Sequence, residues 1–128
     1  MYNIFDPSVI TVYQGNALML EIRLTDPETG HPIPVENDDY ILFTVANKNG
    51  ETVIQKRLTS DNYDPEAELL TCRIDPADTM DLPTGEYAYD CLYVCGQDTP
   101  STFASSVFVI VKSYGKIPVT APEQQGGG

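Results

Sequence analysis

The chain has 128 residues, of which 41% are hydrophobic, a size and composition typical of one globular domain with a single core. Nineteen acidic residues against seven basic ones give a formal net charge of -12, which argues against nucleic-acid and anionic-membrane partners. No apolar run approaches the ~18 residues of a membrane span, and the first residues lack the charged and apolar regions of a signal peptide, so we expect neither.

Short alternating segments fill the first part of the chain. The apolar run at 9–14 ends at the turn dipeptide Gly15-Asn16. In the run at 17–24 every second residue is apolar, which predicts a half-buried strand. The connection at 25–39 is rich in proline and aspartate, so we expect a long loop there.

A hairpin is predicted in the next part of the chain. The segments at 40–46 and 51–59 are rich in β-branched and aromatic residues. Between them Asn49 and Gly50 are expected to supply the positive-φ residues of a tight turn.

The second half continues the strand pattern with one interruption. A strand is predicted at 68–74, and Asp75 followed by Pro76 predicts a single helical turn over 75–82. The last two segments, 86–95 and 101–112, are apolar on both faces, a pattern typical of strands in the middle of a sheet.

About seven strands with one short helical turn predict an all-β fold, an immunoglobulin-like antiparallel β-sandwich over 1–112, followed by a flexible tail at 113–128. In such a sandwich a tyrosine near the start of the sixth strand anchors the preceding corner by bonding upstream backbone. The predicted corner here consists of Pro83, Gly85, Tyr87 and Tyr89. The chain lacks the cysteine and tryptophan pattern of antibody domains.

Four stretches resemble known phage proteins: "ITVYQGNALMLEIRLTDPETGHPI", "YILFTVANKNGETVIQK", "IDPADTMDLPTGEYAYDCLYV" and "FASSVFVIVK". Together, over about residues 8–112, they resemble the small structural β-domains of tailed phages and prophages of Gram-positive hosts. These include the N-terminal domain of baseplate upper proteins and immunoglobulin-like modules of head and tail fibres. The resemblance implies a virion scaffold role and transfers no catalytic residue.

One acidic segment offers oxygen ligands of the kind that calcium prefers, from Asp61, Asn62, Asp64 and Glu66. The segment lacks the residue order of an EF-hand loop, so we favour a solvated turn and regard these residues as weak calcium candidates.

No catalytic residue, cofactor site or structural metal site is predicted. Asp90 is a carboxylate within an apolar strand, for which a structural role is favoured over that of a perturbed acid. The single histidine, His31, lies in a loop without a CxxC pair, so a zinc site is not expected. The three cysteines are expected to be reduced, with Cys72 and Cys91 buried.

The resemblance implies a non-enzymatic module of a phage or prophage virion, in the tail, baseplate or a head appendage, made in the bacterial cytoplasm. Its partners would be other virion structural proteins, with homo-oligomers left open. The alternative is a carbohydrate- or ligand-binding module of a bacterial surface protein, with the loops at 26–39 and 61–66 as its binding end.

Overall fold

The computed structural model describes residues 2–4, 9–26, 28–96 and 100–114. These residues form short strands and two single helical turns, and no described helix is long and apolar enough to cross a membrane. The elements are β1 (Tyr2–Ile4), β2 (Ile10–Tyr13), β3 (Leu18–Ile22), β4 (Tyr40–Ala46), β5 (Thr52–Leu58), η1 (Ser60–Asn62), β6 (Tyr63–Asp64), β7 (Leu69–Ile74), α1 (Pro76–Met80), β8 (Gly85–Val94) and β9 (Ser101–Val111).

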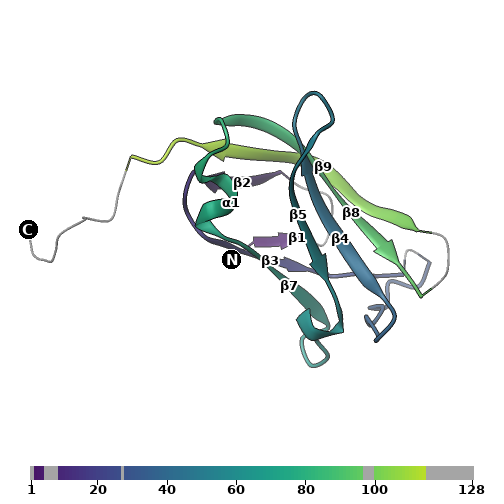
Figure 1. The fold of residues 1–128 in the computed structure, drawn as a ribbon. Coiled ribbons are helices and arrows are strands. Elements are labelled where there is room, and N and C mark those ends of the chain that lie inside the picture. Colours follow the sequence, from purple (N-terminus) through teal and green to yellow (C-terminus); the bar gives the residue numbers. More distant parts are fainter. Residues whose placement is uncertain (1, 5–8, 27, 97–99, 115–128) are drawn as a thin grey trace, which may run out of the picture.

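The strands form two sheets that pack face to face (Figure 1). The four-stranded sheet has the order β1-β3-β7-β6, and the five-stranded sheet has the order β2-β9-β8-β4-β5. Neighbours pair antiparallel, except that β1 pairs parallel with β3 and β2 pairs parallel with β9. The middle strand of the larger sheet is therefore β8, with β9 and β4 on its two sides.

This strand arrangement is that of an immunoglobulin-like sandwich. In that fold the second and fifth strands share one sheet, and the third, sixth and seventh share the other. Here β3 and β7 correspond to the second and fifth strands and lie in one sheet, and β4, β8 and β9 correspond to the third, sixth and seventh and lie in the other. The predicted all-β immunoglobulin-like sandwich is thus confirmed by the topology.

The core lies between the sheets and follows the predicted alternation. Burying each large apolar side chain contributes about 1.5–3 kcal/mol to folding. Phe43 lies at the centre, with the ring of Tyr89 at 5.6 Å and that of Phe108 at 6.3 Å between centroids. The fully buried aliphatic residues include Ile10, Leu20, Ile22, Ile41, Val45, Leu70, Ile74 and Ile110.

Two short strands were not predicted, so the described part of the chain has nine strands. β1 spans three residues and β6 two, which is too few for a two-residue period to stand out in a sequence. The predicted tail at 113–128 lies outside the described residues from position 115 onward.

The predicted hairpin joins β4 and β5, but its turn differs from the expected one. Gly50 has a φ of 81°, whereas Asn49 is not among the residues with positive φ. The Gly50 N–H donates to the Asn47 carbonyl at 2.9 Å, and the Asn47 N–H donates to the Glu51 carbonyl at 2.9 Å. This pattern is a type I turn completed by a left-handed glycine, which needs one positive-φ residue rather than two.

The predicted helical turn over 75–82 is present as α1, and its cap also differs in detail. Pro76 is the first helical residue, as expected. The carboxylate of Asp78 accepts the backbone N–H of Asp75 at 2.7 Å. The Asp75 carboxylate instead binds Arg73.

Candidate functional site

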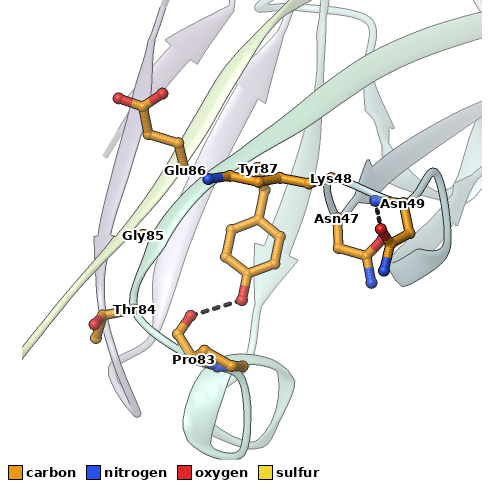
Figure 2. A pocket seen from close by; sticks show the side chains of 8 residues that line it. All are labelled: Asn47, Lys48, Asn49, Pro83, Thr84, Gly85, Glu86 and Tyr87. Carbon is orange, nitrogen blue, oxygen red and sulfur yellow. Dashed lines mark hydrogen bonds between the residues drawn. The ribbon is translucent and has the colours of Figure 1, made fainter.

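The chain enters β8 through a tight corner. Gly85 has a φ of 138°, in the region that favours glycine. The Tyr87 hydroxyl donates a hydrogen bond of 2.6 Å to the carbonyl oxygen of Pro83, shown as a dashed line in Figure 2. Tyr89 is 2% exposed and stacks obliquely on Phe43 in the core. The structure therefore brings the four corner residues together, and both tyrosines face the interior.

A shallow cavity of about 250 Å³ lies beside this corner. Figure 2 shows the ring of Tyr87, with Pro83 below it, on one side and the turn at 47–49 on the other. The Asn47 side-chain oxygen already accepts two backbone N–H groups of its own turn. The cavity is thus a seam between two loops, lined by the 47–49 turn and the corner at 83–87.

Asp39 joins three segments at the opposite end of the sandwich. Asp39 is only 9% exposed. Its carboxylate accepts hydrogen bonds from the backbone N–H groups of Glu36 and Gly96, both at 3.1 Å, and from the Tyr93 hydroxyl at 3.5 Å. Burial, a hydrogen bond with Cys95 and the Asp39 charge raise the pKa of Tyr93. The sequence analysis missed Asp39, because Tyr93 and Gly96 lie 54 and 57 positions away and no local pattern links them.

The loops at 26–39 and 61–66, suggested as a binding end, adjoin the same end of the sandwich. β4 begins where the first loop ends, and β5 ends just before the second, with Ile41 opposite Leu58 in the ladder. The Ser60 hydroxyl, directly before the second loop, lies 3.5 Å from the side-chain oxygen of Asn37.

The four calcium candidates take part in local turns or face solvent. The Asn62 side-chain oxygen accepts the backbone N–H of Thr59 at 3.0 Å and so caps η1. Asp64 accepts two backbone N–H groups from the turn that follows it. Asp61 and Glu66 are exposed. In the described ranges no group of three or more His, Cys, Asp or Glu side chains is placed to hold a metal ion.

Lys56 crosses the open side of the sandwich from the edge strand β5. Its ammonium lies 2.7 Å from the Asp78 carboxylate and 3.6 Å from that of Asp75. Partial burial alone would lower the pKa of Lys56, but the hydrogen bond to Asp78 and the two negative charges outweigh it and raise the pKa. Arg73 holds Asp75 at 2.6 Å, and this bond lowers the pKa of Asp75. An inward-pointing charge also protects an edge strand from pairing with another chain.

The three cysteines are free thiols, as predicted. Cys72 on β7 and Cys91 on β8 are buried in the core from opposite sheets, whereas Cys95 is partly exposed. Burial raises the pKa of Cys72 to about 12 and raises that of Cys91 as well.

The outer face of the five-stranded sheet is open and largely apolar. No described helix or strand lies over it (Figure 1), and Ala88 near its middle is exposed. A sandwich sheet usually alternates apolar residues inward with polar residues outward. On the three inner strands β4, β8 and β9 the outward positions of this outer face are Leu42, Thr44, Ala46, Glu86, Ala88, Asp90, Leu92, Ser105, Val107, Val109 and Val111.

No protein-family model matches the chain, and the comparison with curated proteins gives no match. Among solved structures the chain is similar to the immunoglobulin-like domain of mouse leukocyte-associated immunoglobulin-like receptor 1, in a strand-swapped dimer. The sequence identity is 17%, the match covers 85% of this chain and 94% of that chain, and the TM-score is 0.45. A likeness of this degree carries no argument about function, partners or oligomeric state.

Proposed function

We propose that the chain is a non-enzymatic structural module of a phage or prophage particle, in the tail, baseplate or a head appendage, and that it acts through protein–protein contacts. The observation that carries the proposal is the open, apolar outer face. An apolar surface that a single chain leaves uncovered is typical of a site where another protein packs.

The stretches that carry the phage resemblance also support the proposal. They coincide with framework features, namely the β2–β3 turn at Gly15, the β4–β5 hairpin and the corner at Gly85 before β8. A scaffold module needs a defined framework more than a reactive site, and these features shape the framework.

Mass spectrometry of gradient-purified particles from the source strain tests the proposal. The chain is expected in a fixed ratio to the most abundant particle protein across the gradient. An abundant host protein of similar mass serves as the control for carry-over. A chain that is expressed but sediments away from the particles would overturn the proposal.

A variant pair links the test to the outer face. Val107→Lys places a charge in the middle of the apolar strand β9 and is expected to lower incorporation into particles by at least tenfold. Ala67→Lys adds the same charge at an exposed position in the turn between β6 and β7, on the other sheet, and serves as the matched control. Equal incorporation of both variants would show that the outer face is not the contact.

A second candidate is a carbohydrate- or ligand-binding module of a bacterial surface protein. The shared end of the loops at 26–39 and 61–66 favours it, because convergent loops are the usual binding element of a sandwich. A glycan array probed with the labelled chain tests it. Binding that survives Val107→Lys but is lost on replacing the 61–66 loop would favour this candidate over the first.

A further inference from the structure

Asp90 lies at the centre of the outer face. It belongs to β8, the middle strand of the larger sheet, and stands in register with Thr44 on β4 and Ser105 on β9. Its strand neighbours on the same face are Ala88 and Leu92. The side chains around it bury it in part, so that Asp90 is a carboxylate surrounded by small and apolar groups.

No hydrogen bond or ion pair from the described residues reaches the Asp90 carboxylate. Three other partly buried carboxylates have partners: Asp39 accepts three hydrogen bonds, Asp78 pairs with Lys56, and Asp75 pairs with Arg73. Glu21 on β3, also partly buried, makes no hydrogen bond or ion pair with the described residues. Asp90 therefore differs from the three carboxylates that link segments of the fold.

An unpaired carboxylate on a sheet is unfavourable for the isolated chain. Aspartate is one of the residues least suited to strands, and partial burial removes water from the charge without supplying a partner. Threonine or valine would suit the position better on grounds of stability. A binding role explains the carboxylate, because a charge left unsatisfied in the free protein can be satisfied by a ligand.

We propose that Asp90 is the anchor of a protein-docking surface on the outer face, and that the partner presents apolar side chains around one arginine or lysine that pairs with Asp90. The proposal deepens the proposed function, on which it rests for the biological role of that partner. The surface is of suitable size, because the three inner strands at about 4.8 Å spacing and six residues of β8 enclose roughly 300 Å², at the lower end of the range of functional apolar patches.

Charge distinguishes this partner from a second copy of the chain. On its three inner strands the outer face carries two carboxylates, Glu86 and Asp90, and no basic residue, while the edge strand β5 adds Arg57, whose guanidinium lies over the Tyr40 ring. Two such faces packed about the central strand would bring two Asp90 side chains together, which disfavours the pair. A cationic partner removes that repulsion and also satisfies the carboxylate.

Benzamidine is a suitable probe, because its amidinium resembles the head of arginine and its ring supplies an apolar surface. It would be titrated into the ¹⁵N-labelled chain, with benzyl alcohol and benzoate as the neutral and anionic controls. We expect benzamidine to shift amide signals around Asp90, Thr44 and Ser105 more than either control does. Asp90→Asn should weaken benzamidine binding by about three- to tenfold, whereas Asp81→Asn, at the exposed residue that follows α1, should leave it unchanged.

A stability measurement separates docking from a structural role. Asp90→Thr is expected to raise the melting midpoint by about 3 °C, because it removes an unpaired charge from a strand. A lower midpoint would show that Asp90 supports the fold and would overturn the proposal. The same conclusion would follow from equal effects of Asp90→Asn and Asp81→Asn or from benzamidine shifts confined to other surfaces. It would also follow from a dimer in sedimentation that Val107→Lys dissociates. These experiments use the isolated chain, so their failure would remove Asp90 as the anchor and leave the particle test unaffected.

Discussion

Replacing Tyr87 by phenylalanine should destabilise the fold by about 1 kcal/mol. The change removes only the 2.6 Å hydrogen bond from its hydroxyl to Pro83, since the ring that packs in the core is retained. A typical hydrogen bond contributes about 0.5–1.5 kcal/mol net, and the exposed Pro83 carbonyl can regain a water molecule. For a domain of this size the loss corresponds to a fall of about 4 °C in the melting midpoint. Tyr87→Ala should cost about 3–5 kcal/mol, because it also leaves a cavity.

Urea denaturation followed by far-ultraviolet circular dichroism measures both changes in the free energy of unfolding. Tyr40→Phe is the matched control. Its ring lies beneath the Arg57 guanidinium at 4.1 Å, and its hydroxyl makes no hydrogen bond within the described ranges. We expect this control to remain within about 0.5 kcal/mol of wild type. A Tyr87→Phe variant as stable as Tyr40→Phe would refute the corner as an anchor, and a fully stable Tyr87→Ala would place Tyr87 in a recognition surface instead.

Three further predictions concern charges and thiols. Lys56→Met should lower the free energy of unfolding by about 1–2 kcal/mol, because it leaves the Asp78 carboxylate without its cation. The control Lys48→Met breaks no ion pair among the described residues and should change the free energy of unfolding little. Alkylation of the native protein should modify Cys95 first, with three adducts only after unfolding; three equally fast adducts would contradict the buried positions of the other two. Burial raises the pKa of Cys72 from 9.0 to about 12. The protonated thiol therefore stabilises the fold fully below pH 9 and progressively less as the pH rises to 12. The urea midpoint of the wild-type protein should fall across that pH window, and that of Cys72→Ala should fall less.

The sequence was sufficient to predict elements whose signals are local. The alternation of Leu20 and Ile22, the glycine of the β4–β5 turn and the Asp75-Pro76 start of α1 each depend on residues within a few positions. Burial of these alternating positions then determines which face of each strand points inward, because a shift of one residue would expose the whole apolar set. The corner belongs to the same class, since Tyr87 and Pro83 are four positions apart.

Features that depend on distant residues could not be predicted in this way. Asp39 accepts hydrogen bonds from two groups more than fifty positions away. Lys56 forms an ion pair with Asp78 across the gap between the two sheets. The apolar outward positions of β8 and β9 were correctly interpreted as central strands of a sheet. The sequence could not show that nothing in the described chain covers them, because coverage is a property of the assembled sheets and not of any strand.

The distribution of charge connects the acidity of the chain with the proposed docking surface. The loop at 26–39 carries five acidic residues and the segment at 61–68 carries four, so negative charge is concentrated at one end of the sandwich. The outer face holds only Glu86 and Asp90 on its inner strands. A field of this kind attracts a basic partner over about one Debye length and keeps other copies of the chain apart. Asp90 would then fix the register of the partner on a face that is otherwise mostly apolar, so that the long-range field and the local anchor select the same chemical class of partner.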